Sequence, residues 1–427
     1  MSEQKKQKVC VIGMGYVGLP LAAVCAKKGY EVMGFDTDTA KLAIIAQGKS
    51  PFKEEFLEKL LPQVKINVTA DENEIKGYDI YLICVPTPVD AKYFPILTPV
   101  IDASRTVAAH MKKGALVVLE STVNPGVSAE VVRPIFEKAG FEVGKDVFIA
   151  HCPERVNPGD SKWNVGNLPR VVGSFDEKGL KIAKDFYESV VDGEIMAMDS
   201  IEEAEAVKIL ENSFRDVNIA FVNEAAKSFS HLNIDITNVI RGASTKPYSF
   251  MAHWPSCGVG GHCIPVDPYY MIEKAKEHNF DHKFLRTART INNSMPEYTV
   301  DLLQHRLNQV EKSVKGTKIG IMGLSYKANV SDLRESPALK IIEKLRKLGA
   351  DLIIFDPFVP GLSNVKSIDE LLEKSDALLL TANHAEFVQI PVENFAKNNI
   401  KIIIDGKNCL DKKAIQTAGI VYSGIGR

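Results

Sequence analysis

The sequence lacks any long hydrophobic run. No stretch of its 427 residues approaches the roughly 20 apolar residues that a membrane-spanning helix needs. Residues 2–8 are polar and lead directly into a short apolar strand that ends in glycines, whereas a secretory signal needs a longer apolar run and a small-residue cleavage site. We therefore expect a cytoplasmic protein with no membrane partner.

An excess of charge of one sign is also missing. The chain has 52 basic and 54 acidic residues and a formal net charge of −2. Its pI is near 6.5. A nucleic-acid backbone attracts a surplus of positive charge, and this balanced composition offers none. We do not expect nucleic acid to be a partner.

Cysteines are few and follow neither a disulfide nor a metal-binding pattern. The seven cysteines are odd in number and scattered, mostly within apolar strand or helix patterns, which is typical of reduced thiols in a cytosolic enzyme. There is no C-x-x-C pair, and adjacent ligands such as His262 and Cys263 rarely fit one tetrahedral site with Cys257 and His253. We expect no disulfide framework and no metal.

The order of the apolar runs indicates three parts. The chain is longer than one ordinary core allows, and its 45% apolar and 25% charged residues are those of a globular protein. Short apolar runs alternate with amphipathic stretches before residue 190 and again after residue 316, the pattern of doubly wound parallel sheets. Two long helical patterns, at 202–232 and 284–312, lie between. We predict an α/β protein with two Rossmann-like sheets, in residues 1–199 and 315–427, joined by a long-helix central domain in residues 200–314.

Nine apolar runs are expected to form the buried strands of these sheets. They are residues 8–13, 31–36, 79–85, 115–120, 147–151, 318–323, 351–356, 377–381 and 401–405.

A glycine fingerprint follows the first of these strands. Gly13, Gly15 and Gly18 form a G-x-G-x-x-G motif that opens an amphipathic helix, and the next strand ends in Asp36, which is the spacing of a dinucleotide site. Gly13 permits the turn, Gly15 lets a pyrophosphate approach the backbone, and Gly18 lets the helix pack on the strand. Asp36 would accept hydrogen bonds from the adenosine ribose and repel a 2′-phosphate. We therefore predict NAD, rather than NADP, as the cofactor.

Other strand ends offer weaker signals. Residues 85–88 and 120–122 fall at the same carboxyl edge of the first sheet, where ordinary turns and helix caps would look the same. The second α/β region has only two of the fingerprint glycines, which indicates a ligand other than a dinucleotide. Lys327 and Arg334 precede Ser336 and Pro337, a typical N-cap and first-turn pair. Two cations beside a helix N-terminus suit a diphosphate, although a solvated basic loop has the same composition.

Cys263 lies in the glycine-rich run 258–267. Glycines let other groups approach the backbone closely, and Asp267 follows the thiol by four residues, an arrangement suited to covalent chemistry. A cysteine by itself is more often a buried, inert side chain.

Three further polar residues accompany this thiol. Lys208 and Asn212 share one helix face, which taken alone is a polar stripe. Glu154 follows a predicted strand at the edge where active sites collect, and its simplest interpretation is a surface carboxylate paired with Arg155.

Taken in order, these motifs resemble the UDP-glucose/GDP-mannose dehydrogenase family. The resemblance covers essentially the whole chain, and the Gly-Gly-x-Cys block is highly specific. Members oxidise the C6 alcohol of a nucleotide sugar to a carboxylate with two NAD+. The motifs are Gly13-x-Gly15-x-x-Gly18, Val85-Pro-Thr-Pro88, Ser121-Thr122, Pro153-Glu154, Lys208-x-x-x-Asn212, Gly260-Gly-His-Cys263-x-Pro-x-Asp267 and Leu333-Arg-Glu-Ser-Pro337.

The resemblance implies a role for each residue type. Cys263 would attack the aldehyde from the first oxidation and hold it, after the second, as a thioester. Lys208 and Asn212 would stabilise the oxyanion, and a neighbouring ammonium would lower the thiol pKa. Asp267 and Thr122 would position a water that serves as base.

The binding contacts that the resemblance implies form two sets. Those to the cofactor are Gly13, Gly15, Tyr16, Val17, Gly18, Asp36, Pro86, Thr87, Thr122 and Arg334. Those to the nucleotide sugar are Glu154, Arg155, Lys208, Asn212, Tyr248, Phe250, Gly260 and Lys327.

Departures from the family pattern bear on hydrolysis and substrate. Glu154 would assist hydrolysis of the thioester, but the second glutamate that UDP-glucose-specific members commonly carry is Pro158 here, so the group that activates the water stays open. The segments 153–159, 211–221 and 245–250 look like members that act on UDP-N-acetylhexosamines. The mannosamine branch tends to have a His-Pro-Arg-containing loop at 245–250, so we predict UDP-N-acetylglucosamine over UDP-N-acetylmannosamine.

Three alternative functions are compatible with the same sequence. The chain could be a UDP-glucose 6-dehydrogenase, a non-catalytic NAD-binding sensor with a structural Cys263, or a two-electron 3-hydroxyacid-type dehydrogenase with the same N-terminal fold. The long central helix is typical of a dimer face, and we expect a homodimer.

Overall fold

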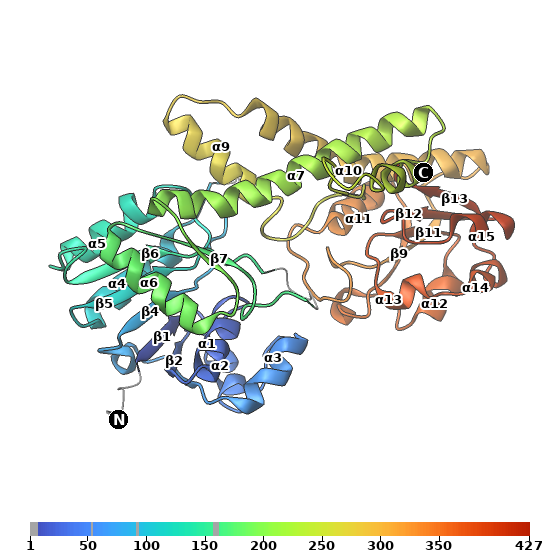
Figure 1. Cartoon of the computed structure of the whole chain (residues 1–427). Helices are drawn as coiled ribbons and strands as arrows, with labels where there is room; N and C mark the ends of the chain where they lie inside the picture. The colour runs from blue at the N-terminus through green and yellow to red at the C-terminus, as the bar shows by residue number, and fades with distance from the viewer. Residues whose placement is uncertain (1–6, 53, 91–93, 157–161) are drawn as a thin grey trace. The chain divides into compact units, whose positions relative to one another are not determined.

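The computed structural model describes residues 7–52, 54–90, 94–156 and 162–427. The chain forms two compact units. One comprises Met1–Glu211 with Tyr269–Phe280, and the other comprises Asn212–Pro268 with Asp281–Arg427. Each unit is built on one sheet with helices on both faces, so the α/β prediction with two Rossmann-like sheets is confirmed (Figure 1).

The first unit contains an eight-stranded sheet in the order β3-β2-β1-β4-β5-β6-β7-β8. The Val-, Ile- and Leu-rich runs form strands whose side chains are buried on both faces, as expected for a parallel sheet. β7 departs from the parallel pattern, since it pairs antiparallel with β6. The strands are β1 (Lys8–Ile12), β2 (Glu31–Phe35), β3 (Asn67–Thr69), β4 (Ile80–Ile83), β5 (Ala115–Leu119), β6 (Val147–His151), β7 (Arg170–Ser174) and β8 (Ile195–Ala197).

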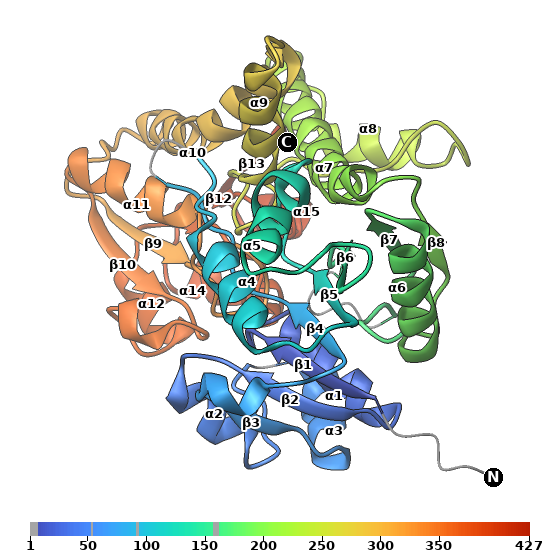
Figure 2. The ribbon, with the colours of Figure 1, turned by 90° about the vertical axis from the view of Figure 1, so that its left-hand side faces the viewer.

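Helices cover both faces of this sheet. α1, α2, α3 and α6 bury apolar side chains in the core on one face, and α4 and α5 bury theirs on the other. Figure 2 shows α4 and α5 beside each other in front of the sheet. The helices are α1 (Gly18–Lys27), α2 (Thr39–Ile45), α3 (Glu55–Leu60), α4 (Thr98–His110), α5 (Arg133–Lys138) and α6 (Glu177–Val190).

The strand order of the first sheet reverses between β1 and β4. β2 lies on one side of β1 and β4 on the other, and both are parallel to it. Loops that leave the carboxyl ends of two such strands turn to opposite faces of the sheet, which opens a crevice where ligands bind in this class of fold. The glycine motif follows β1, at this crevice.

The second unit contains a five-stranded parallel sheet in the order β10-β9-β11-β12-β13. α10 and α11 cover one face and α12 to α15 the other. The strands are β9 (Lys318–Met322), β10 (Asp351–Phe355), β11 (Ala377–Leu380), β12 (Ile402–Asp405) and β13 (Val421–Gly424). The helices are α8 (Ile236–Ala243), α10 (Lys283–Gln309), α11 (Pro337–Lys347), α12 (Ile368–Lys374), α13 (Ala385–Val388), α14 (Val392–Lys397) and α15 (Lys412–Thr417).

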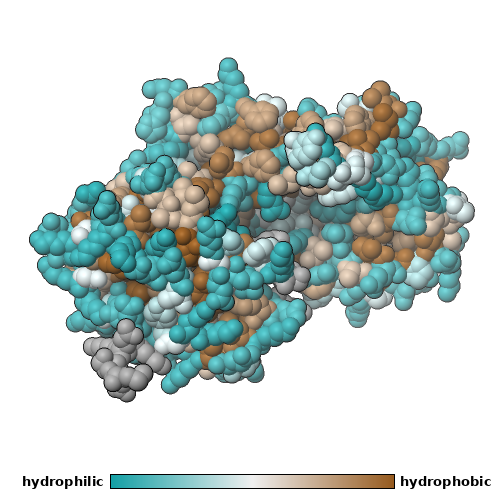
Figure 3. Space-filling view, viewed as in Figure 1, coloured by the Kyte–Doolittle hydropathy of each residue, from teal (hydrophilic) through white to brown (hydrophobic). Residues whose placement is uncertain are grey.

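Two helices contain residues of both units. α7 (Ile201–His231) is one helix of 31 residues, and α9 (Asp267–Glu277) begins four residues after Cys263. The long helices predicted at 202–232 and 284–312 correspond to α7 and α10. Apolar surface gathers along these long helices in the space-filling view (Figure 3). No helix in the described ranges is long and apolar enough to cross a membrane.

Candidate active site

The glycine motif forms a tight turn between β1 and α1. Gly13 has φ +94°, and a Cβ there would lie 2.8 Å from the Cys84 carbonyl oxygen. A Cβ on Gly18 would lie 1.9 Å from the Gly13 oxygen, so only glycine lets α1 pack this closely. Around Gly15 no atom lies within 4 Å of the Cβ position. The glycine loop therefore leaves open space beside the N-terminus of α1, and a diphosphate fits such a space.

Asp36 follows β2 and is held as an anion. Its Oδ2 accepts from the Met14 N–H and the Lys41 Nζ, each at 2.8 Å, and its Oδ1 accepts from the Asp38 N–H at 2.9 Å. Burial acts to raise the pKa of Asp36, but the hydrogen bonds from Lys41 and from the backbone outweigh it and leave the pKa below its ordinary value. An ionised carboxylate at this position fits the ribose hydroxyls of NAD. The role of Lys41 was not predicted from the sequence, although this lysine lies in the first turn of the helix that follows Asp36.

Tyr16 and Val17 lie between the glycines. The Tyr16 ring is half-exposed and stacks on Phe52, with ring centroids 4.1 Å apart and an interplanar angle of 25°. Val17 is partly buried against the core beside α1. Phe52 is a second residue that the sequence did not reveal, because nothing local links it to a turn 36 residues earlier.

The loops after β4 and β5 carry Pro86, Thr87 and Thr122. Pro86 is exposed, and Thr87 and Thr122 are partly buried. The Ser121 hydroxyl donates to the Val85 oxygen at 2.7 Å and joins these loops across the two strand ends. The Tyr270 hydroxyl donates to the Thr87 oxygen at 2.5 Å, so the first loop is also fixed to α9.

A buried carboxylate fixes the far end of the Thr122 loop. Glu205 on α7 accepts from the Gly126 N–H at 2.6 Å and from the Ser128 N–H at 2.8 Å. Burial raises the pKa of Glu205 to about 7. Glu205 carries no local signal in the sequence, since its partners lie 77 and 79 residues away along the chain.

Glu154 belongs to a buried charge cluster rather than to an exposed pair with Arg155. Arg170 donates to Glu154 at 2.9 Å and to both oxygens of Glu120 at 3.0 and 3.1 Å. The Tyr187 hydroxyl also donates to Glu120. Burial raises the pKa of Glu120 to about 7. The other Glu154 oxygen accepts from the next two backbone N–H groups, each at 2.6 Å.

The Arg155 side chain pairs with a different carboxylate. Its Nε donates to Glu211 at 3.1 Å, and its guanidinium forms an ion pair with the same residue. Glu211 comes from α7, so this pair ties the loop after β6 to the long helix. Residues 157–159 of the predicted 153–159 motif, including Pro158, lie outside the described residues.

The loop that carries Cys263 is bound to the second unit at two points. The Cys257 N–H donates to the Gly406 oxygen after β12, and the Gly261 N–H donates to the Arg334 oxygen, both at 2.8 Å. A Cβ on Gly260 would lie 2.5 Å from the Tyr326 Cβ, so glycine is required for this close approach. Cys263 itself is partly exposed.

Asn212 and Asp267 meet in this unit. The Asn212 amide donates to the Asp267 carboxylate at 2.5 Å, and both side chains are buried. The Asp267 N–H donates to the Cys263 oxygen at 2.8 Å, which closes the turn into α9. Lys208 lies one turn before Asn212 on α7 and is partly buried.

The cations predicted beside α11 lie in the loop between β9 and that helix. Arg334 forms an ion pair with Asp332 at 2.5 Å, and Lys327 is partly buried. Ser336 accepts from the Ala338 N–H as the N-cap with Pro337 in the first turn, which confirms the predicted cap.

Tyr248 and Phe250 lie in the loop after α8. Tyr248 is 67% exposed, and Phe250 packs partly buried against a small core between α7, α8 and α10. Among the described residues no group of three or more His, Cys, Asp or Glu side chains is arranged to hold a metal ion.

A glycine turn with open space over Gly15 and an ionised Asp36 form a dinucleotide site of the kind that NAD-dependent oxidoreductases carry. The chain belongs to the UDP-glucose/GDP-mannose dehydrogenase family. The family's NAD binding domain matches residues 7–191, its central domain residues 202–294, and its UDP binding domain residues 320–412. The protein is therefore a nucleotide-sugar dehydrogenase.

Several relatives are similar over almost their whole length. A UDP-N-acetyl-D-mannosamine dehydrogenase of Pyrococcus horikoshii is 36% identical, over 98% of this chain and 99% of its own. A UDP-N-acetyl-D-glucosamine 6-dehydrogenase of Pseudomonas aeruginosa is 33% identical, over 92% of this chain and 94% of its own. The solved structure of the UDP-D-ManNAc dehydrogenase from Pyrococcus horikoshii has a TM-score of 0.93, 35% identity and 99% coverage of both chains.

Proposed function

We propose that the protein oxidises the C6 alcohol of a UDP-N-acetylhexosamine to the carboxylate in two NAD-dependent steps. The observation that carries this proposal is the partly exposed Cys263 in a glycine loop bonded to the second sheet. A two-electron alcohol dehydrogenase has no need of such a thiol, whereas a four-electron oxidation needs a nucleophile to hold the aldehyde. The family's UDP binding domain supports a UDP-sugar as the substrate.

The chemistry assigned to Cys263 has three steps. When NAD+ is bound, it accepts the hydride in each of the two oxidations. The thiolate adds to the C6 aldehyde and forms a thiohemiacetal, which loses a hydride from C6 to become a thioester. Water then attacks the thioester carbon and loses a proton, the C–S bond breaks with the Cys263 thiolate as the leaving group, and the carboxylate product is released.

The polar residues near the thiol in sequence and on α7 take supporting roles. Lys208 and Asn212 stabilise negative charge on the C6 oxygen, and Asp267 with Thr122 positions a water that takes the alcohol proton. Glu154 assists hydrolysis. Arg170 donates to its carboxyl group at 2.9 Å and so fixes its position in the first unit.

The proposed binding contacts do not follow the proposed domain boundaries strictly. Residues 1–199 hold NAD, residues 200–314 form the central domain, and residues 315–427 hold the UDP-sugar. Gly13, Gly15, Tyr16, Val17, Gly18, Asp36, Pro86, Thr87, Thr122 and Arg334 contact NAD. Glu154, Arg155, Lys208, Asn212, Tyr248, Phe250, Gly260 and Lys327 contact the nucleotide sugar.

The epimer is the finer part of the proposal. The loop 245–250 favours UDP-N-acetylglucosamine, and that preference stays a prediction. UDP-N-acetylmannosamine is the second candidate, favoured by relatives named for it that match this chain over 98% of its length or more. A single NADH assay with both sugars decides between them.

We also propose a homodimer through α7. Phe214 and Phe221 are large apolar side chains on this helix that are 47% and 64% exposed. Trp254 and Met251, on a loop of the same unit, are 46% and 66% exposed. Burying such side chains against a second copy would remove them from water. A monomer mass at micromolar concentration in sedimentation would refute the dimer.

The oxidation is tested by counting electrons. Purified protein is incubated with a limiting amount of UDP-GlcNAc, UDP-ManNAc, UDP-glucose or GDP-mannose, and NADH is measured at the endpoint. We expect two NADH per molecule of a UDP-N-acetylhexosamine. One NADH per sugar, or a Cys263→Ala variant that forms uronate at the wild-type rate, would end the covalent mechanism.

A further inference from the structure

The end of β10 in the second sheet has the same local structure as the end of β2 in the first sheet. The Gly13 N–H donates to the Phe35 oxygen at 2.8 Å, and the Gly323 N–H donates to the Phe355 oxygen at 2.9 Å. As Asp36 follows β2, Asp356 follows β10. Asp356, however, is fully buried, so this carboxylate is not available to a ribose. It is used inside the protein instead.

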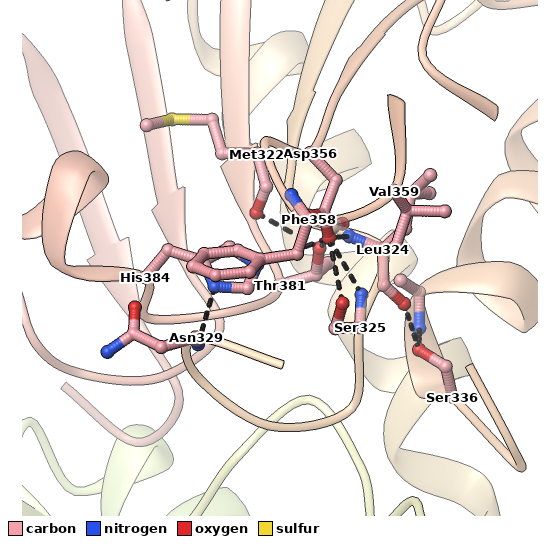
Figure 4. A network of polar contacts seen from close by, with 12 residues as sticks. Met322, Leu324, Ser325, Asn329, Ser336, Asp356, Phe358, Val359, Thr381 and His384 are labelled. Carbon is pink, nitrogen blue, oxygen red and sulfur yellow. Dashed lines mark hydrogen bonds and ion pairs between the residues drawn. The ribbon is translucent and has the colours of Figure 1, made fainter. Parts of the chain in front are cut away.

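Asp356 is the centre of a buried polar network (Figure 4). Its Oδ2 accepts from the Leu324 N–H at 2.6 Å, from the Ser325 N–H at 2.9 Å and from the Ser325 hydroxyl at 3.1 Å. His384 Nε2 lies 3.1 Å from the same oxygen and is also fully buried. A fully satisfied buried network of this kind holds one arrangement of its members.

The second ring nitrogen of His384 fixes Asn329. His384 Nδ1 accepts from the Asn329 N–H at 2.8 Å, so the ring proton is on Nε2 and is donated to Asp356. The Asn329 side-chain oxygen accepts from the Ala385 N–H at 3.1 Å. Asn329 has φ +59°, a left-handed conformation that these two bonds hold in place.

Phe358 and Phe387 pack against the His384 imidazole. The Phe358 ring centroid lies 4.9 Å from that of His384, with an interplanar angle of 31°, and the Phe387 centroid lies 5.4 Å away, edge-on. The imidazole is therefore fixed on two sides by rings and at both nitrogens by hydrogen bonds.

These contacts fix the loop 324–336. Its two ends are joined, because the Ser336 hydroxyl donates to the Leu324 oxygen at 2.6 Å. Asn329 lies near its middle and is tied to α13, and the same loop carries Lys327 and Arg334. The loop is thus held at its ends and at its middle.

The loop 324–336 is also the surface against which the cysteine loop is bound. Tyr326 lies against Gly260 and Gly261, and the Arg334 oxygen accepts from the Gly261 N–H. Pro337, the next residue after the loop, lies against Gly258. A displacement of the loop 324–336 would therefore move the backbone that presents Cys263.

We propose that His384 and Asp356 are positioning residues for the reaction, acting through Asn329 on the loop 324–336. Neither contacts the reacting atoms. Together they set the place of Lys327 for the diphosphate of the nucleotide sugar, the place of Arg334 for NAD, and the place of the Cys263 loop. The part of this proposal that concerns the diphosphate rests on the proposed function, and the part that concerns Cys263 does not.

The test compares His384→Leu with His384→Gln. Leucine removes both hydrogen bonds, whereas a glutamine amide donates to Asp356 and accepts from the Asn329 N–H, so it restores both. Ala385→Pro is a milder variant, since it removes only the donor to the Asn329 side chain at a first-turn position that tolerates proline. Asn364→Leu is the matched control. It breaks hydrogen bonds to the Ile354 N–H and the Leu352 oxygen on β10, and neither partner lies in the loop.

Four quantities are measured on folded protein. They are the affinity for UDP by calorimetry, KM and kcat for the sugar, and the rate at which iodoacetamide alkylates the Cys263 peptide by mass spectrometry. For His384→Leu we expect a loss of about 10-fold or more in kcat/KM and in UDP affinity, and an altered alkylation rate, since a 1 Å misplacement costs up to about 100-fold. His384→Gln and Asn364→Leu should stay near wild type, and Ala385→Pro should change in the same direction as His384→Leu by less.

Each other outcome overturns the proposal. It falls if His384→Leu keeps wild-type values, if His384→Gln loses as much as His384→Leu, or if Asn364→Leu loses as much. Should His384→Leu not fold, a wild-type alkylation rate and UDP affinity in Ala385→Pro would overturn it. The alkylation rate needs no substrate, so it still tests the Cys263 part if no UDP-N-acetylhexosamine is oxidised.

Discussion

Asn212 donates from its side-chain amide to the Asp267 carboxylate at 2.5 Å, and both side chains are buried. This bond joins the middle of α7 to the first residue of α9. The Asp267 N–H in turn donates to the Cys263 oxygen at 2.8 Å. The long helix therefore holds the segment that presents the thiol.

Replacing Asn212 tests this link. Asn212→Ala removes the donor to Asp267 and the proposed oxyanion contact, so we expect kcat to fall about 10²-fold. The free energy of unfolding should fall by about 1–3 kcal/mol. NADH assays and urea titrations measure both. Asn218→Ala on the same helix, where the amide donates to the Phe214 oxygen, is the control and should keep its kcat. An unchanged kcat in Asn212→Ala would remove Asn212 from the catalytic set.

The buried Arg170 cluster predicts a large stability effect. Arg170→Met leaves two buried carboxylates, Glu120 and Glu154, without their cation. We expect a loss of about 3–5 kcal/mol in the free energy of unfolding, because an uncompensated buried charge is costly. Arg133→Met breaks an exposed ion pair with Glu137 and should cost less than about 1 kcal/mol. If urea titrations gave the same loss of unfolding free energy in both variants, the buried cluster would contribute no more to stability than an exposed ion pair.

Glu205 predicts a pH dependence of stability. Burial raises its pKa from 4.5 to about 7 in the folded protein. The folded state therefore keeps this proton when the unfolded state has lost it, and stability falls as pH rises from about 4.5 to about 7. The loss from this one group is on the order of 3 kcal/mol. Glu205→Gln carries no titrating group at this position.

The comparison of wild type and Glu205→Gln isolates that contribution. Glu120 titrates in both proteins, so its effect cancels in the difference. Urea midpoints at pH 5 and pH 8 should differ more in the wild type than in the variant. The same difference in both proteins would assign the pH dependence to other groups.

Asp36 predicts the cofactor preference. Asp36→Asn removes the negative charge that repels a 2′-phosphate while Lys41 remains beside it. We expect the ratio of kcat/KM for NAD+ over NADP+ to fall by about 10-fold or more. A tenfold change requires the loss of only about 1.4 kcal/mol of repulsion between the carboxylate and the 2′-phosphate. Asp38→Asn is the control, because asparagine also caps α2 and leaves the preference unchanged. A preference that survives in Asp36→Asn would mean that shape, not charge, excludes NADP+.

Local sequence was sufficient for the cofactor turn and for the nine predicted strands, but not for β3, β7, β8 and β13. Apolar runs of four or five residues, a G-x-G-x-x-G spacing and an aspartate at a strand end are read within a few tens of residues, and β1, β2 and Asp36 were found in this way. The Ser336 cap was predicted for the same reason. The antiparallel β7 was missed, because Arg170–Ser174 has only two consecutive apolar residues and its direction depends on β6.

Polar partners distant in sequence could not be predicted. Arg170 meets Glu120 across 50 residues, and His384 meets Asp356 across 28. Each of these side chains, read alone, is an ordinary charged or polar residue, and only the fold brings it to its partner. The simple interpretation of Glu154 as a surface partner of Arg155 was wrong for this reason, since Arg170 holds Glu154 in a buried site.

The hydrogen bond from Cys257 to Gly406 sets a condition for building hybrid enzymes. Exchanging residues 315–427 alone for those of a relative would leave the Cys263 loop bonded to Gly406 and Arg334 carbonyls supplied by another sequence. Residues 212–268 and 281–427 form one compact unit, and the thiol belongs to it. A transplant of the second sheet must therefore carry Cys263 with it.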